Sequence, residues 1–147
     1  MPLIAWNDDY SIGVPQIDEH HQHLFFLANR FYDIFVKEAP SQDLNPLFED
    51  LIDYIIYHFV AEEQLMQEHR FPHYEMHKKE HENLSQRLVE LDKQYSVDKK
   101  HLLIETVVFL YNWLASHIVQ SDAEFGRFIA LDYHAVSRNG NGSKLTV

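Results

Sequence analysis

The sequence contains no cysteine among its 147 residues. That absence excludes disulfides, thiolate zinc sites and thiol nucleophiles together. Basic residues are also scarce, because 12 Lys and Arg stand against 23 Asp and Glu, which gives a formal net charge of −11 at pH 7. A chain this acidic is a poor partner for nucleic acid and for an anionic membrane surface. The side chains that remain for chemistry are those that carry oxygen or nitrogen.

Long apolar runs are missing as well. No uninterrupted stretch approaches the roughly 18 residues of a membrane span, so we expect no membrane insertion. The start, Met1–Tyr10, has neither a basic segment nor a long apolar one, which predicts no secretion signal and a cytoplasmic location. The chain is 46% hydrophobic and 14% aromatic, which is enough to bury the core of one domain.

The predicted fold is an all-α, antiparallel up-down-up-down four-helix bundle, because four segments show helical periodicity and the connections between them are short. We expect helices at about residues 18–38, 45–67, 72–95 and 98–131, with Asp18 as the N-cap of the first. Residues 1–17 are predicted to form an extended N-terminal arm that packs on the bundle, residues 18–131 the bundle, and residues 132–147 a flexible C-terminal tail.

Histidine is what the chain has in excess, with 11 residues. In the third predicted helix, His77 and His81 lie one turn apart on a stripe of apolar residues that should face the core. A pair at this spacing can place two imidazole nitrogens on one metal ion. The alternative is a polar break in an ordinary core.

The second predicted helix carries a histidine and a carboxylate on its inward stripe, His58 and Glu62. Burying an unpaired carboxylate costs several kcal/mol. A buried ion pair would offset that cost, yet no lysine or arginine falls on an inward stripe, so a metal cation is the simpler source of positive charge. Glu63 is turned about 100° away, which predicts a solvated side chain.

The fourth predicted helix adds an inward histidine, His117, on the face of Leu114 and Phe125. Four inward histidines and a glutamate on three helices favour a metal centre over separate core histidines. Iron, zinc, manganese and copper all accept such ligands. The ligand number exceeds one tetrahedral site, which indicates two metals bridged by carboxylates.

Three histidines compete in the first predicted helix, and a fourth competes in the third. His23 points about 120° away from the inward face, His21 about 40° and His20 about 60° on the other side. Periodicity therefore prefers His21 only slightly over His20. His73 shares the face of His77 but lies at the start of its helix, near the end of the bundle. His69, His101 and His134 fall near segment ends or off the inward stripes, which predicts surface positions for them.

Four segments, taken in order, resemble one family. They are Asp18-Glu19-His20-His21 followed by Leu24-Phe25, His58-Phe59-Val60-Ala61-Glu62-Glu63, His77-Lys78-Lys79-Glu80-His81, and Trp113-Leu114-Ala115-Ser116-His117-Ile118-Val119-Gln120-Ser121-Asp122. Each is weak alone, but together they span roughly residues 6 to 125 and resemble the bacterial hemerythrins, which are non-haem di-iron oxygen-binding four-helix bundles. The family pattern Asp-x-x-His, followed by two residues and Leu-Phe, selects His21.

The resemblance implies a ligand set for two iron ions. It assigns His77, His81 and His117 to one iron and His21 and His58 to the other. It makes Glu62 and Asp122 bridging ligands, together with an oxo or hydroxo group. The second iron would then have one protein ligand fewer, which leaves a position open for dioxygen.

The function implied is reversible dioxygen binding for storage, transport or delivery, without enzymatic activity beyond a weak peroxidase- or oxidase-type side reaction. The HxxxE and HxxxH spacings, in place of ExxH, favour binding over oxygen cleavage. The alternatives are a di-iron peroxidase or oxidase, and a module that senses oxygen or iron for a partner. The expected partners are dioxygen and an oxygen-consuming recipient protein, and the expected state is a monomer.

One spacing does not suit a regular helix. Asp122 follows His117 by five residues, which turns it about 140° away. A one-residue π-bulge would bring both side chains to one face, and such bulges are frequent at functional sites. We predict a bulge between them. The alternatives are an Asp122 that reaches the metals from another height and one that faces solvent or caps a short last turn.

Overall fold

The computed structural model describes the backbone of residues 1–37, 44–95 and 99–142, and the side chains of residues 1–37, 44–94 and 103–132. Its elements are a short 3₁₀ turn η1 (Asp8–Tyr10), helices α1 (Pro15–Val36), α2 (Asn45–Glu68), α3 (Tyr74–Tyr95) and α4 (Lys99–Trp113), a π-helical segment η2 (Leu114–Asp122), and helix α5 (Ala123–Gly142). Within these ranges there is no strand.

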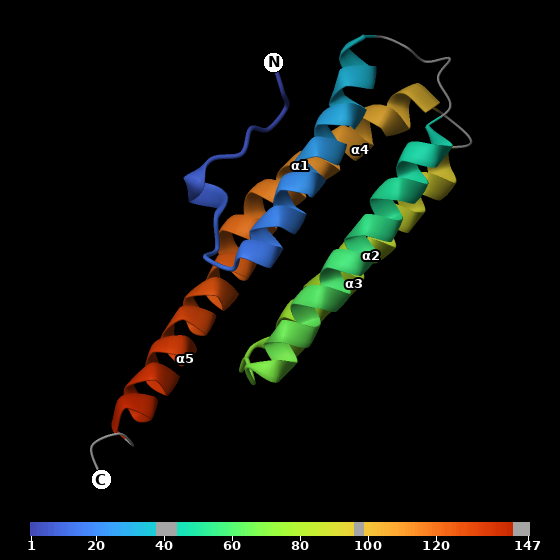
Figure 1. Cartoon of the computed structure of the whole chain (residues 1–147). Helices are drawn as coiled ribbons and strands as arrows, with labels where there is room; N and C mark the ends of the chain where they lie inside the picture. Colours follow the sequence, from blue (N-terminus) through green and yellow to red (C-terminus); the bar gives the residue numbers. More distant parts are fainter. Residues whose placement is uncertain (38–43, 96–98, 143–147) are drawn as a thin grey trace.

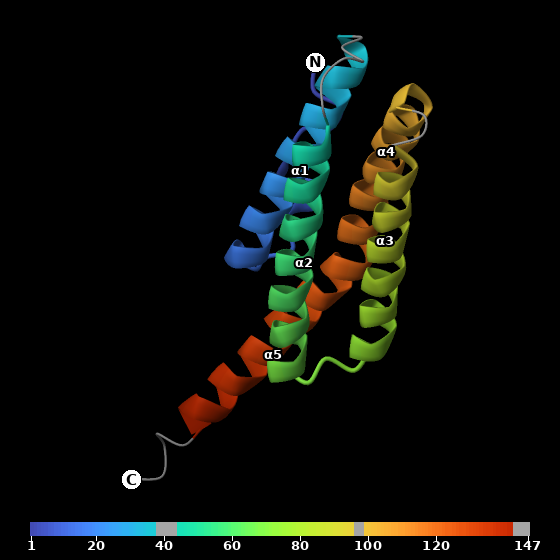
Figure 2. The ribbon, with the colours of Figure 1, turned by 90° about the vertical axis from the view of Figure 1, so that its right-hand side faces the viewer.

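The predicted four-helix bundle is confirmed. Helix α1 packs on α2 and α4, and α3 packs on the same two helices, so that each helix contacts two neighbours around a common core. Successive helices run in opposite directions, and α4, η2 and α5 follow one another as one long helix (Figures 1 and 2). None of the described helices is long and apolar enough to cross a membrane.

Helix α1 begins earlier than the sequence suggested, and Asp18 is not its N-cap. The cap is Val14, and Pro15 occupies the first turn, where its missing N–H needs no partner. The Asp18 carboxylate instead accepts hydrogen bonds from the Ser11 hydroxyl (2.6 Å) and the Ile12 backbone N–H (2.8 Å). Asp18 therefore ties the N-terminal arm to the first turns of α1.

The arm also packs along α1 and reaches the start of α5. The ring of Phe25 contacts Trp6 and Tyr10, with centroids 5.4 and 4.8 Å away. At Gly126 in α5, a Cβ would lie 2.2 Å from the backbone oxygen of Ile12, so only glycine allows this approach. The arm thus covers one side of the bundle by close backbone contact.

At the other end of the chain, α5 continues to Gly142, past the boundary at residue 131 that we predicted for the bundle. It projects beyond the other helices (Figures 1 and 2). The segment predicted as a flexible tail, residues 132–147, is therefore helical as far as Gly142, and residues 143–147 lie outside the described residues.

The core is divided into two apolar clusters. The larger includes Phe31, Phe48, Leu51, Leu91 and Leu110, all fully buried. The smaller consists of Met66, Phe71 and Phe125, near the turn that joins α2 to α3. Along α2, α3 and the long fourth helix, the buried histidines and carboxylates fall between residues of these two clusters. Apolar packing therefore lies on both sides of the polar site along these helices.

Candidate metal centre

Every residue that the sequence and the family resemblance marked as a metal ligand is buried. The exposed fraction is at most 5% for each of His21, His58, Glu62, His77, His81, His117 and Asp122. They come from α1, α2, α3 and η2, so all four helices of the bundle contribute. Side chains so polar are rarely fully buried unless they have partners, which makes their mutual geometry decisive.

Five of these residues form a first group, Glu62, His77, His81, His117 and Asp122, whose ligand atoms lie within 4.8 Å of one another. The Nε2 atoms of His77 and His117 are each 2.9 Å from Asp122 Oδ1. The Nε2 atom of His81 lies 3.2 Å from that of His117 and 3.3 Å from Glu62 Oε2. Ligand atoms at right angles around one ion, each about 2.1 Å from it, would be about 3.0 Å apart.

A second group consists of His21, His58, Glu62 and Asp122, under the same 4.8 Å limit. His21 Nε2 lies 2.9 Å from Asp122 Oδ2, whereas the first group faces Oδ1 of the same carboxylate. His58 Nε2 lies 3.6 Å from Glu62 Oε2. The two groups therefore share both carboxylates, and Asp122 turns one oxygen toward each.

The fit to metal ions rests on polar atoms that lack partners. No hydrogen bond reaches either oxygen of Glu62 or Asp122, nor His77 Nε2, although nitrogens and oxygens lie close together. Both carboxylates are fully buried, and within the described side chains their ion-pair partners are all histidines. Lone pairs that converge without hydrogen bonds, beside two buried carboxylates that pair with no lysine or arginine among the described side chains, suit metal cations.

The π-helical segment η2 brings the last two of these residues together. Hydrogen bonds in a π-helix join residues five apart, so its turns are wider than those of an α-helix. His117 and Asp122 are five apart and lie in contact, with Nε2 2.9 Å from Oδ1. The predicted bulge is confirmed, and it extends over the whole of Leu114–Asp122.

A family model, described as "Hemerythrin HHE cation binding domain", matches residues 12–129 of the chain. The chain belongs to the hemerythrin family. Curated proteins named bacteriohemerythrin are similar to it along most of their length. The one from Aquifex aeolicus is 34% identical over 128 residues, which covers 82% of this chain and 93% of that protein. The one from Methylococcus capsulatus is 28% identical over 127 residues, which covers 86% and 96%.

Solved structures agree with this assignment. A crystal structure of a hemerythrin L114A mutant superimposes with a TM-score of 0.76 at 26% identity, covering 87% of this chain and 98% of that one. The corresponding L114Y mutant gives the same TM-score and identity over 86% and 97%.

The pKa values of three of these histidines are shifted, and not all in the same direction. Burial disfavours protonation of His117, but Asp122 and Glu80 outweigh it and raise the pKa of His117 to about 10. For His77 burial is likewise outweighed by Asp122 and Glu62, and the pKa rises to about 9. Burial dominates at His58 and lowers its pKa to about 3. Burial also opposes ionisation of Asp122, yet the surrounding histidines, His117 foremost, hold its pKa well below its ordinary value.

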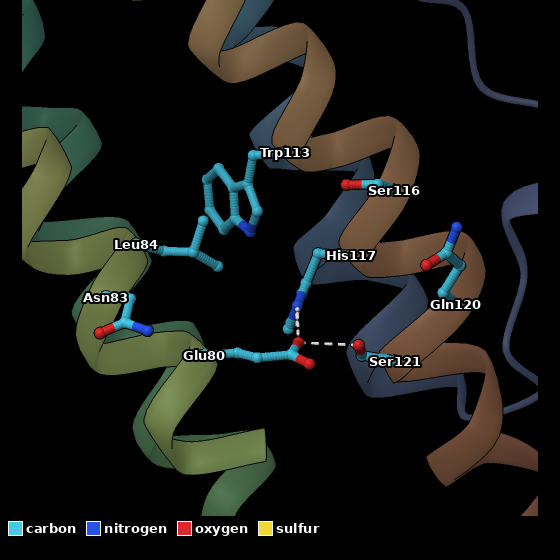
Figure 3. Close-up of a pocket in the computed structure, with 8 residues that line it drawn as sticks. All are labelled: Glu80, Asn83, Leu84, Trp113, Ser116, His117, Gln120 and Ser121. Atoms are coloured by element: carbon cyan, nitrogen blue, oxygen red, sulfur yellow. Dashed lines mark hydrogen bonds and ion pairs between the residues drawn. The ribbon is translucent and has the colours of Figure 1, made fainter. Parts of the chain in front are cut away.

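Sequence reasoning missed a carboxylate behind the first group. The Nδ1–H of His117 donates to Glu80 Oε2 (2.9 Å), and the Ser121 hydroxyl donates to the same oxygen (2.7 Å). These hydrogen bonds, that from His117 above all, lower the pKa of Glu80 to about 2. Glu80 lies on a pocket of about 300 Å³ that Trp113 and Leu84 also line (Figure 3). Its position three residues after His77 and one before His81 was the available signal.

The three histidines that the sequence left as alternatives to the predicted ligands have different environments in the structure. His20 is buried but belongs to neither metal-ligating group, and its Nδ1 lies 3.1 Å from His58 Nδ1. His23 is exposed, as predicted, and its ring lies against Tyr54. His73 is half exposed and pairs with Glu124.

Two further sequence-based expectations concern groups near the surface. Glu63 was predicted to be solvated; its side chain is 19% exposed, with Oε1 3.9 Å from His81 Nδ1. His69, predicted to lie at the surface, is partly exposed and pairs with Asp132. The same prediction for His101 and His134 falls on side chains outside the described residues.

Proposed function

We propose that this member of the hemerythrin family binds dioxygen reversibly at a non-haem di-iron centre and serves oxygen storage, transport or delivery. The observation that carries the proposal is the pair of buried ligand groups that share two carboxylates, Glu62 and Asp122. Family membership supports a non-haem iron and oxygen-binding role, and the bacteriohemerythrin names of its relatives favour a binding protein over an enzyme.

In this proposal His77, His81 and His117 hold one iron, and His21 and His58 hold the other. Glu62 and Asp122, which belong to both groups, would bind both ions. The support is the division of the histidines, three in one group and two in the other. The position with two histidines has one protein ligand fewer, which leaves room for dioxygen. When bound, the iron pair supplies electrons that dioxygen takes up and returns.

The surrounding side chains keep this chemistry away from water. Phe25, Phe59, Leu114 and Ile118 are all buried. The ring of Phe59 stacks on His81, with centroids 3.7 Å apart and an interplanar angle of 5°. Such packing holds the imidazole in place and lowers the local dielectric constant. A dry pocket slows the loss of bound oxygen as superoxide, since that anion and its counter-charge are stabilised by water.

The test is to measure metal content and then reversibility. Elemental analysis should find about two irons per chain. The anaerobic ferrous protein should become coloured in air and return to its starting spectrum under vacuum over repeated cycles. A single irreversible oxidation accompanied by turnover of a reducing substrate would favour a peroxidase or oxidase. A pull-down that captures a partner only in one oxygenation state would favour a sensor.

A cytoplasmic location, a monomeric state and an oxygen-consuming recipient protein stay predictions that accompany this function. Size-exclusion chromatography with light scattering on the iron-loaded protein checks the monomer. Transfer of oxygen to a candidate oxidase in a mixed assay checks delivery.

A further inference from the structure

His20 is a buried histidine that the proposed iron ligation leaves unused. Only 5% of it is exposed, and it precedes the ligand His21 in α1. Its Nδ1 lies 3.1 Å from Nδ1 of His58, and the two rings are nearly perpendicular, at 81° with centroids 5.3 Å apart. A contact between two ring nitrogens at this distance needs one proton between them.

The position of that proton follows from the other side of His58. Its Nε2 faces the shared carboxylates, 3.6 Å from Glu62 Oε2. A nitrogen that binds a metal must keep its lone pair free, so a neutral His58 carries its proton on Nδ1. His58 is then the donor, the Nδ1 lone pair of His20 is the acceptor, and the proton of His20 lies on Nε2.

We propose that His20 is a positioning residue for the metal ligand His58: by accepting the Nδ1–H of His58, it fixes the tautomer and the ring orientation with which His58 presents Nε2 to the second metal. This inference rests on the ligand assignment made under the proposed function. Partners of this kind orient metal-binding histidines and tune their donor strength.

The His20 ring also packs against two tyrosines. The rings of Tyr54 and Tyr57, both on α2, lie 5.9 and 5.0 Å from the His20 ring between centroids. These tyrosines precede His58 on the same helix, so α2 supplies both the ligand and the packing behind its partner. This packing restricts rotation of the His20 ring, whose Nδ1 contacts His58.

Variants of His20 test the proposal on the iron-loaded full chain. Asparagine places an amide oxygen where Nδ1 of histidine lies and can accept the same hydrogen bond, whereas leucine has nearly the same shape and no acceptor. We expect His20→Leu to weaken binding of one iron by about 10- to 100-fold and to alter the Mössbauer signature of that iron alone. His20→Asn should restore most of both, and His23→Asn, at an exposed histidine of the same helix, should match the wild type.

A second test uses the wild-type protein and needs no variant. In zinc-loaded protein with ¹⁵N-labelled histidine, NMR should show a coupling across the hydrogen bond between the Nδ1 atoms of His20 and His58, with the proton on His58. Absence of the coupling, or a proton on His58 Nε2, overturns the proposal. So do equal losses in His20→Leu and His20→Asn, or changes at both irons.

Failure of the proposed function looks different. A wild-type chain that takes up no iron or zinc refutes the metal centre itself. A His58→Ala variant that keeps both irons refutes the ligand assignment. A chain that binds two irons, loses one in His58→Ala and is unchanged in His20→Leu refutes only the role of His20.

Discussion

The two groups of the candidate metal centre differ in what lies behind their histidines. Behind His117 is the carboxylate of Glu80, whose side chain is 48% exposed at the edge of a pocket. Behind His58 is a neutral imidazole, His20, which is buried under two tyrosines. A carboxylate acceptor draws the Nδ1 proton more strongly than an imidazole does, so it would make the histidine a better electron donor to a bound metal ion.

The asymmetry between the two groups therefore extends beyond the number of histidines in each. The side with three histidines has an anionic outer partner near solvent, and the side with two has a neutral partner in the interior. The pKa of His117 is raised, by Asp122 first and by Glu80 after it, whereas burial lowers the pKa of His58. The less donating environment coincides with the position that we propose for dioxygen.

The largest effect is expected from Asp122→Asn, because Asp122 belongs to both groups and faces each with a different oxygen. The amide keeps the shape but removes one of the two shared charges. Iron content should fall from about two per chain to nearly none by elemental analysis. Glu124→Gln, at an exposed carboxylate two residues further along the chain, is the control and should keep both irons. Two irons retained in Asp122→Asn would contradict the shared-carboxylate centre.

Replacing one histidine at a time should reduce iron binding at one of the two groups only. We expect His77→Ala and His21→Ala each to lose about one iron per chain, and the Mössbauer signals that remain to be complementary. His23→Ala is the matched control, since His23 is exposed and contacts no proposed ligand. Full iron content in His21→Ala together with a loss in His20→Ala would transfer the ligand role to His20.

Glu80→Gln should weaken the side that has the anionic partner. His117 keeps a hydrogen-bond acceptor but loses the nearby charge, so we expect about 10- to 100-fold weaker binding of one iron and a higher reduction potential. Competition with a chelator and redox titration measure the two effects. Glu82→Gln removes an exposed carboxylate of the same helix that pairs with Lys79, and it should change neither. An equal effect of both variants would indicate a general surface-charge effect.

His20→Asp should make the two sides alike by placing a carboxylate behind His58. A negative charge there stabilises the ferric state, so the reduction potential should fall relative to His20→Asn, which has the same shape and no charge. The Mössbauer parameters of the two irons should become more similar. Identical potentials in the two variants would show that the outer partner of His58 does not reach its metal electronically.

The smallest effect is expected at the arm that covers the α1 and η2 side. A Cβ in Gly126→Ala would collide with the backbone of Ile12, which overpacks the contact. Alanine also favours the helix, so the net loss of unfolding free energy should be about 1 kcal/mol. The melting temperature of the metal-free protein should fall by roughly 2–4 °C in calorimetry. An unchanged or higher melting temperature would show that the arm can move away from residue 126 without loss of stability.

Patterns local to one helix were sufficient for much of the site. His77 and His81, and likewise His58 and Glu62, are four residues apart, so any α-helix that buries one member of a pair brings the other close to it. Because no lysine or arginine falls on an inward stripe, the sequence also indicated that a metal cation supplies the positive charge beside Glu62. Even the irregular turn at His117 and Asp122 was predicted, because a five-residue offset conflicts with an α-helix and agrees with a π-helix.

Contacts between helices could not be predicted from patterns within a single helix. Periodicity placed His21 only about 20° nearer to the inward face than His20, a difference within the variation of helix packing. Glu80 lies on the outer part of α3, and nothing in its own segment shows that His117 of η2 donates to it. The start of α1 was misplaced because Asp18 has the chemistry of an N-cap, whereas its partners come from the arm.

By itself, then, the sequence determined a cysteine-free, acidic four-helix bundle with inward histidines and carboxylates, because composition and helical period act within single segments. The tertiary structure alone decided which nitrogen meets which carboxylate, that Asp122 belongs to two groups, and that His20 and Glu80 contact different histidines of the site. Those outcomes depend on the rotation and height of one helix against another, and these are set only when the whole core packs.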